Sequence, residues 1–550
     1  MHRRSFLRLA GAAAFAGSAN PAWVPGAAGS APSSDFAALA AQMTAGGLTS
    51  ERLTRHYLDR IQALDRRGPC LRAVLETNTR ALDIAAALDR ERALQGPRGP
   101  LHGIPILIKD NIETADRMMT TAGSLALQGW YAPKDAPLIE RLRAAGAVIL
   151  GKTNLSEWAN FRSAHSSSGW SARGGQTRNP YALNRTPSGS SSGSAVAVAA
   201  RLCAAAIGSE TDGSIVSPAS INGIVGLKPT VGLVSRRGIV PISHSQDTAG
   251  LLARSVHDAA LLLGAISGPD PLDEGAAQAG AAQAGAVQAG AARASAAAQG
   301  VTEAVPKFLA DYRQFLDPNG LQGARLGIAR KFFAENEPMN AFLDRCIGVL
   351  TRAGAILVDP ADLPMHGEWE APELEVLLYE FKTDLNAYLD RLPLNFPVRS
   401  LEALIRFNEA NAAQELKFFG QELLRRSQAK GDLNEEAYRQ ARASCLAATR
   451  ANGIDALIVE HRLDAIVTLT SGPAWLIDEV NGDSDTGGCS SPAAIAGYPH
   501  ITVPAGLHRG LPVGLSFFGP AFSEPLLVKL ASGFEHAASP PPVPAMHPSI

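Results

Sequence analysis

The segment APLIERLRAAGAVILGKTNLSEWAN, residues 136–160, carries the pattern that decides the fold class. Its first part has apolar residues at helical spacing, and the run AVIL at 147–150 is typical of a short buried strand. A second helix is expected to open near Thr153. Helices that alternate with buried strands predict an α/β protein in which helices sandwich a sheet.

The same alternation extends in both directions from this segment. Residues 35–96 are predicted to be helical, and GIPILIKDNI at 103–112 is a short apolar strand that ends in polar residues. Residues 301–450 are more charged and are predicted to form a helical excursion. Strand-like runs return at 463–469, where the sheet is expected to close. We therefore expect residues 35–540 to form a single large domain.

Residues 275–300, GAAQAGAAQAGAVQAGAARASAAAQG, differ from the rest of the chain. They repeat every five residues and offer only methyl groups to a core. We expect a low-complexity surface insertion that is disordered or loosely helical. A linker at a domain boundary is the alternative, because linkers have similar compositions.

The first 31 residues resemble a targeting segment. Arg3 and Arg4 precede Phe6 and Leu7, and a weakly apolar stretch rich in alanine and glycine follows. This order resembles a twin-arginine export signal, so we expect cleavage within 19–31, contact with the export machinery, and a periplasmic or secreted protein. An ordinary secretion signal and a short amphipathic start are the alternatives.

The composition describes an ordinary folded protein. The chain has 550 residues, 46% hydrophobic residues, 19% charged residues and a formal net charge of −2. The scattered Lys and Arg residues give no footprint for nucleic acid, and after the first 30 residues no apolar run reaches the ~18 residues of a membrane span. The histidines show no metal-binding spacing, so neither a metal nor a cofactor is expected. The five cysteines are far apart in the chain and predict neither a disulfide framework nor a zinc site. They are Cys70, Cys203, Cys346, Cys445 and Cys489.

A match to the phosphate-loop pattern G-x-x-x-x-G-K-[ST] occurs at GAVILGKT, residues 146–153. A phosphate-binding loop needs its strand before the first glycine and a loop between the two glycines. Here the residues between the glycines are Ala, Val, Ile and Leu, which form the strand itself. The match therefore does not predict nucleotide binding.

Two short runs combine small and hydroxyl residues. In SGSSSGS, residues 188–194, a tight turn opens a helix-like Ala/Val run, although the composition also suits a flexible linker. In TDGS, residues 211–214, successive N–H groups of a tight turn can hold an oxyanion, with Ser214 placed as a nucleophile. A structural turn serine is the alternative for Ser214.

Lys109 is a candidate base because it ends the buried strand GIPILI. Partial loss of solvation lowers the pKa of a lysine and raises its neutral fraction. A neutral lysine amine is able to accept a proton as a general base. The alternatives are that Lys109 reaches solvent from the strand end, or that it pairs with Asp110.

The order and spacing of these motifs resemble the amidase signature family. The similarity covers nearly the whole chain outside the insertion, and the exported start and SETDGSI most resemble the bacterial peptide amidases, which remove ammonia from C-terminally amidated peptides. The segments that carry it are GIPILIKDNI, GKTNLSEWANFRS, GSSSGSAVAVAA, GSETDGSIVSPASINGIVGLKPTVGLVS, GIVPISHSQDTAGLLARSV and SSPAAIAGYPHITVPAGLHRGLPVGLSFFG.

The resemblance implies a large, mixed, twisted sheet with helices on both faces and a serine amidohydrolase that works through an acyl-enzyme. Lys109 matches the family's base, Ser190 the bridging serine after a cis peptide bond at Gly189–Ser190, and Ser214 the nucleophile. The implied oxyanion donors are the backbone N–H groups of Thr211, Asp212, Gly213 and Ser214. The family commonly has glycine where this chain has Ser188, Ser192 and Asp212.

Three other functions remain alternatives. An amidase for small, aryl or fatty amides shares the chemistry, as does a glutamine-hydrolysing amidotransferase subunit, whose cytoplasmic partners disagree with an export signal. A noncatalytic binding protein on the same scaffold is the alternative from another class. The pocket walls are expected from 119–130, 155–170 and 470–490. Within them, core positions are favoured for Trp158, Trp170 and Trp475, and Asp478, Asp483 and Asp485 either read a substrate amine or face water.

Overall fold

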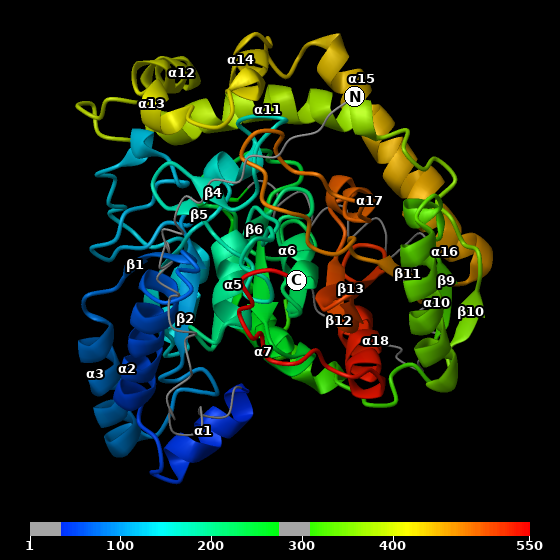
Figure 1. Cartoon of the computed structure of the whole chain (residues 1–550), viewed down its shortest axis with the longest axis horizontal. Helices are drawn as coiled ribbons and strands as arrows, with labels where there is room; N and C mark the ends of the chain where they lie inside the picture. Colours follow the sequence, from blue (N-terminus) through cyan, green and yellow to red (C-terminus); the bar gives the residue numbers. More distant parts are fainter. Residues whose placement is uncertain (1–34, 274–307) are drawn as a thin grey trace, which may run out of the picture. The chain divides into compact units, whose positions relative to one another are not determined.

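The main sheet has eleven strands, which are spread along the chain from Val74 to Phe518 (Figure 1). The computed structural model describes residues 35–273 and 308–550, so the expected export signal and the insertion at 275–300 lie outside the described residues. The strand order is β1-β3-β2-β6-β8-β7-β12-β13-β11-β9-β10. Its strands are β1 Val74–Thr77, β2 Pro105–Lys109, β3 Val148–Thr153, β6 Ala205–Glu210, β7 Val225–Lys228, β8 Thr248–Ala253, β9 Arg325–Ile328, β10 Ile356–Val358, β11 Ala465–Leu469, β12 His500–His508 and β13 Leu511–Phe518. A separate two-stranded ribbon joins β4 Trp170–Ser171 to β5 Gly175–Gln176.

The sheet is mixed, and helices cover both of its faces, as expected. β2 is parallel to β3 and β6, whereas β8 is antiparallel to β6 and β7. The crossover from β2 to β3 runs through α4 (Pro137–Ala144), and the crossover from β3 back to β6 runs through α5 (Ser192–Ala199). Because the two crossovers run in opposite directions along the sheet and such connections are right-handed, they place their helices on opposite faces.

Several other helices extend these two layers. α4 contacts α7, which contacts α18, which in turn contacts α10, while α5 contacts α6 on the other side. The α-helices outside the crossovers are α1 Phe36–Thr44, α2 Ser50–Arg60, α3 Ala81–Gln95, α6 Val216–Ile221, α7 Val256–Ile266, α10 Glu337–Arg352, α11 Glu370–Asp390, α12 Leu401–Ala410, α13 Ala412–Glu415, α14 Glu422–Gln428, α15 Glu436–Leu446, α16 Asp455–His461, α17 Ser491–Ile495 and α18 Glu524–Ala537.

The expected helical excursion at 301–450 is wrong in part. It contains the helices from α10 to α15, but β9 and β10 also lie in it and extend the main sheet beyond β11. Helices α11, α12 and α14 pack on loops near the ends of β2 and β6, where a second apolar cluster includes Trp130, Trp158 and Phe161. In Figure 1, α11 and α15 cross the top of the view. This region therefore packs near the strand ends at which Lys109 lies.

The segment that indicated the fold class behaves as expected except after its strand. α4 and β3 are both present, but β3 runs on through Gly151, Lys152 and Thr153, because these residues pair with β2. The expected helix near Thr153 is wrong, since only a 3-10 turn at Glu157–Asn160 follows. Gly151–Thr153 therefore form strand and not a phosphate-binding loop.

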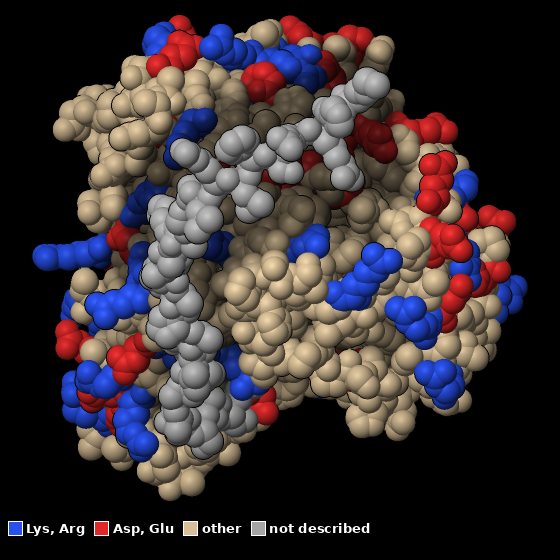
Figure 2. Space-filling view, in the orientation of Figure 1, with Lys and Arg blue, Asp and Glu red and all other residues tan. Residues whose placement is uncertain are grey.

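The surface shows no dominant sign of charge on the face drawn in Figure 2, where acidic and basic side chains both occur around the margin. Within residues 35–273 and 308–550, every helix is too short or too polar to cross a bilayer.

Candidate active site

The Lys109 side chain lies at the end of β2 and is completely buried. Its Nζ lies 2.7 Å from Ser190 Oγ, 2.9 Å from Ser209 Oγ and 3.1 Å from the Ser209 carbonyl oxygen. Burial lowers the pKa of Lys109 to about 7, although the nearby carboxylates of Glu210 and Asp247 oppose this shift. A neutral amine has two N–H donors and one lone pair. It is therefore able to donate twice to Ser209 and accept from the Ser190 hydroxyl.

The peptide bond between Gly189 and Ser190 is cis, as the resemblance implies. A Cβ on Gly189 would lie 2.2 Å from Ser156 Oγ, so only glycine fits at that position. Ser192, where the family commonly has glycine, donates a hydrogen bond to the Ser188 carbonyl oxygen over 2.6 Å. The extra hydroxyl thus closes the turn that holds Ser190, and its Cβ is accommodated.

Ser214 lies at the end of the turn Thr211–Ser214, which we call the oxyanion turn. The Ser191 N–H donates to the Ser214 carbonyl oxygen over 3.1 Å, so the segments that carry Ser190 and Ser214 are directly joined. Lys109 and Ser190 have no exposed surface, whereas 7% of Ser214 is exposed. Ser214 is therefore the member of this set that a substrate is able to reach.

The shape of the oxyanion turn depends on Gly213 and Glu210. Gly213 has a φ of +75°, in the left-handed region that favours glycine. Glu210 Oε2 accepts hydrogen bonds from the N–H groups of Ile215 at 2.6 Å and Val216 at 3.0 Å, which folds the chain back after Ser214. In the described part of the chain, no group accepts a hydrogen bond from the N–H of Thr211, Asp212, Gly213 or Ser214. These four donors are left for an external acceptor.

The sequence did not identify two residues that hold the site together. Ser209 contacts Lys109 and accepts a hydrogen bond from Asn111 Nδ2 over 2.8 Å. Asp247 accepts from Thr211 Oγ1 over 2.6 Å, and its second oxygen accepts from the backbone of 242–243. Ser209 and Asp247 both occur in segments that carry the resemblance to the amidase signature family. Their place in those segments was the one indication in the sequence that they belong to the site.

The expected pocket residues have mixed outcomes. Trp158 and Trp170 are buried, as favoured, and Trp170 packs against Phe418 and Phe419. The core position expected for Trp475 is wrong, because this residue is only half-buried and donates its indole N–H to Asp483 over 3.0 Å.

The three aspartates of the 470–490 segment have separate roles. Asp483 also accepts from the Ser168 N–H and hydroxyl, so it joins two of the expected pocket walls. Asp478 accepts bonds from its own loop, at the N–H of Val480 and Asn481. Asp485 is exposed and accepts from the Gly487 N–H. Asp478 and Asp483 therefore stabilise loops with their carboxylates.

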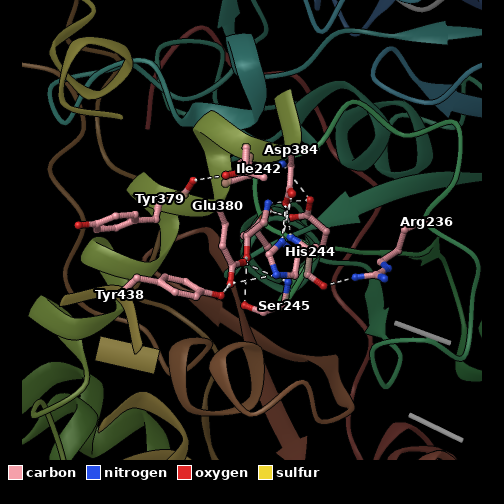
Figure 3. A network of polar contacts seen from close by, with 12 residues as sticks. Arg236, Ile242, His244, Ser245, Tyr379, Glu380, Asp384 and Tyr438 are labelled. Carbon is pink, nitrogen blue, oxygen red and sulfur yellow. Dashed lines mark hydrogen bonds and ion pairs between the residues drawn. The ribbon is translucent and has the colours of Figure 1, made fainter. Parts of the chain in front are cut away.

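A separate group of polar side chains, His244, Glu380 and Asp384, has a composition that metals often use (Figure 3). His244 Nδ1 lies 3.0 Å from Asp384 Oδ2, and its Nε2 lies 3.5 Å from Glu380 Oε1. Burial lowers the pKa of His244, but the hydrogen bond to Asp384 and the charge of Glu380 outweigh it and raise the pKa overall. Since each ring nitrogen already faces a carboxylate, this group forms a network of charged hydrogen bonds.

Two surface cavities lie away from these residues. One of about 270 Å³ lies between Asp65 and Arg173, and one of about 470 Å³ adjoins the C-terminal residues near Pro542. Neither is lined by Lys109, Ser190 or Ser214. The hydrogen-bond geometry, and not cavity size, locates the candidate active site.

The chain is similar to amidases both in sequence and in structure. The profile of the family described as Amidase matches residues 52–528. A protein named "Probable amidase" from Arabidopsis thaliana is 45% identical over 498 residues, which are 89% of this chain and 87% of the relative. The structure of the native peptide amidase from Stenotrophomonas maltophilia is 52% identical, with a TM-score of 0.83 over 92% of this chain and 98% of its own. A structure of a peptide amidase in complex with the competitive inhibitor chymostatin is also 52% identical, with a TM-score of 0.84 over 92% of this chain and 99% of its own.

Proposed function

The chain belongs to the amidase family and is an amide-hydrolysing enzyme, and from that premise we propose that it removes ammonia from the C-terminal amides of peptides through Lys109, Ser190 and Ser214. The observation that carries the proposal is the 2.7 Å contact between the buried Lys109 amine and the Ser190 hydroxyl. The next residue, Ser191, donates its backbone N–H to the Ser214 carbonyl oxygen. A buried amine with a pKa of about 7 suits a general base at neutral pH.

In the proposed reaction, the neutral Lys109 amine takes the Ser190 proton while Ser190 takes the proton of Ser214. The Ser214 oxygen attacks the amide carbon and forms a tetrahedral intermediate. Its oxyanion accepts hydrogen bonds from the free N–H groups of the oxyanion turn, each worth about 3 kcal/mol in the transition state. The proton held on Lys109 returns through Ser190 to the leaving nitrogen, and ammonia departs. Water then hydrolyses the acyl-enzyme by the same proton route.

The substrate class rests on the two peptide amidase structures that are 52% identical to this chain. Small, aryl and fatty amides, and glutamine, remain the alternatives within the same chemistry. We expect ammonia release from amidated dipeptides to be at least ten times faster than from fatty amides or glutamine, with chymostatin as a competitive inhibitor. Equal turnover of fatty and peptide amides would contradict the substrate class.

The serine assignment needs its own test. A Ser214→Ala variant is expected to lose ammonia release from every amide that the wild-type enzyme hydrolyses. Undiminished release would exclude Ser214 as the nucleophile. Binding of amides without turnover by the wild-type protein would instead favour the noncatalytic alternative.

We also propose that residues 1–31 direct the protein to the periplasm by the twin-arginine route. The support is the Arg3–Arg4 pair followed by apolar and small residues. Residues 1–31 fused to a folded fluorescent reporter should deliver it to the periplasm of a bacterial host. Replacing both arginines by lysine should keep the reporter in the cytoplasm, and export that persists would contradict the twin-arginine route.

A further inference from the structure

Asp212 places a carboxyl group beside the oxyanion turn at a position where the family commonly has glycine. Its Oδ2 accepts a hydrogen bond from Ser491 Oγ over 2.7 Å. Its Oδ1 is buried and accepts no hydrogen bond from an N–H group or an alcohol hydroxyl of the described residues. A buried carboxylate oxygen without a donor is costly, so the group that faces it matters.

The group that faces Asp212 is the carboxyl of Glu373, from the first turn of α11. Glu373 is buried, and Gln246 Nε2 donates to its Oε1 over 2.8 Å. The same Gln246 nitrogen lies 3.4 Å from the carbonyl oxygen of Thr211. Glu373 is thus connected both to the side chain of Asp212 and to the backbone of the residue before it.

Two carboxyl groups in contact in a buried site do not both carry a charge, because the repulsion and the loss of hydration are too large. Burial, followed by the charge of Asp212, raises the pKa of Glu373 well above its usual range. Burial also raises the pKa of Asp212, but donors that include Ser491 and Glu373 oppose that change. The proton therefore belongs on Glu373, whose hydroxyl donates to the Asp212 carboxylate.

Helix α11 is also fixed to the loop that carries Gln246 and Asp247 (Figure 3). Glu380 accepts hydrogen bonds from Ser243 Oγ at 2.5 Å and from the Ser245 N–H at 3.2 Å. Asp384 accepts from the His244 N–H over 2.7 Å. These contacts hold the loop against the helix. Helix α11 is therefore connected to the oxyanion turn in two ways, through Glu373 and through the 243–247 loop.

We propose that Glu373 is a positioning residue for amide hydrolysis, which in its protonated form holds the Asp212 side chain and so keeps the N–H groups of the oxyanion turn directed at the substrate. The inference rests on the proposed role of residues 211–214 as oxyanion donors. The proposed partner of the oxyanion turn, Glu373, thus comes from the helical region. It lies 127 positions after Gln246, the residue to which it is hydrogen-bonded.

The test uses an amide that the full-length wild-type enzyme hydrolyses. Glu373→Ala removes the Glu373 donor from the Asp212 carboxylate, so kcat should fall about 10- to 100-fold while KM changes less than about threefold, since a misplaced oxyanion hole mainly affects the transition state. Glu373→Gln keeps an uncharged donor toward Asp212 and an acceptor for Gln246. It should therefore recover kcat to within about threefold of wild type.

The pH profile separates positioning from a merely structural role. In the wild-type enzyme, loss of the Glu373 proton at alkaline pH sets two carboxylates against each other, so kcat should decline, whereas Glu373→Gln should keep its activity there. The charged groups nearby are Asp212, Glu370 on the same helix and Lys228 on β7, and the Cys445 thiol on α15 also faces Glu373.

Glu375→Gln is the matched control, because Glu375 lies two positions away on α11 and pairs with Lys430. It should keep the wild-type kcat and pH profile. Glu373→Gln with as low a kcat as Glu373→Ala would overturn the proposal, and so would Glu373→Gln with the wild-type alkaline decline. The pH comparison of Glu373→Gln with the wild-type enzyme stands even if Glu373→Ala fails to fold. A wrong nucleophile assignment is recognised separately, by an active Ser214→Ala variant.

Discussion

The Nζ of Lys109 lies 2.7 Å from the Oγ of Ser190, although 81 positions separate the two residues in the chain. β2 ends at Lys109 and the cis turn before α5 presents Ser190. Ser191 joins this pair to Ser214, at the end of the turn after β6. The segments that follow β2 and β6 and the turn before α5 are thus held together by one side-chain and one backbone hydrogen bond.

The pH dependence of hydrolysis should follow the protonation of Lys109. Because burial lowers the pKa of this amine to about 7, the neutral base accumulates as the pH rises through 7. We expect kcat/KM for an amidated dipeptide to rise tenfold per pH unit below about 7 and to level off above it, until the alkaline decline expected from Glu373 begins. Lys109→Arg cannot supply a neutral amine and should lose at least 10³-fold in kcat/KM. A profile that is flat from pH 5 to 8 would show that another group is the base.

The Ser190 hydroxyl should be needed for proton transfer and not for substrate binding. We expect Ser190→Ala to lower kcat by about 10²- to 10⁴-fold, the usual range for general acid–base catalysis, with little change in KM. Ser194→Ala is a matched control, because Ser194 is equally buried on α5 but bonds to Thr153 and the Ile207 carbonyl oxygen. Steady-state ammonia release measures both. An active Ser190→Ala would mean that Lys109 acts on Ser214 by another route.

Asp247 should position the oxyanion turn through Thr211. Its two oxygens accept three hydrogen bonds, from Thr211 Oγ1 and from the N–H groups of Ile242 and Ser243. Asp247→Asn turns one acceptor into a donor, so one of these contacts becomes unfavourable. We expect kcat to fall about 10- to 100-fold at an unchanged fold, judged by circular dichroism. Asp270→Asn, at a buried aspartate bonded to Ser235 and Arg237, should leave kcat unchanged. Equal effects in the two variants would reduce Asp247 to a stabilising role.

The sheet and the position of Lys109 were predictable because they rest on local patterns. An apolar run that ends in a lysine places that lysine at a strand end, and helix–strand alternation gives the fold class. β9 and β10 escaped prediction, since they are four and three residues long and β10 is partly exposed at the sheet edge. A short edge strand lacks the continuous apolar run that marks a buried one.

The supporting residues of the site were not predictable from local patterns. Glu373 lies on a helix of mixed composition, and nothing near it in sequence indicates that its carboxyl meets Asp212. Trp475 was misplaced for a related reason, because its indole N–H has a partner in Asp483 at the protein surface. The Glu373 contacts join segments that are brought together only by the fold, whereas the Trp475 contact lies within one loop whose course the sequence pattern does not indicate.

The stability of the loops beside the site should depend on Arg162, which lies buried between two carboxyl groups. Its Nη1 is 2.5 Å from Glu157 Oε1 and 3.6 Å from Glu415 Oε2, and its guanidinium lies over the rings of Trp170 and Phe419. Arg162→Met removes the positive charge and leaves both carboxyl groups buried without it. We expect the free energy of unfolding to fall by about 3–5 kcal/mol, measured by urea titration. Arg406→Met is the control, because its ion pair with Glu402 is exposed and should contribute less than about 1 kcal/mol. If the two variants unfold at the same urea concentration, the buried cluster does not stabilise this part of the protein.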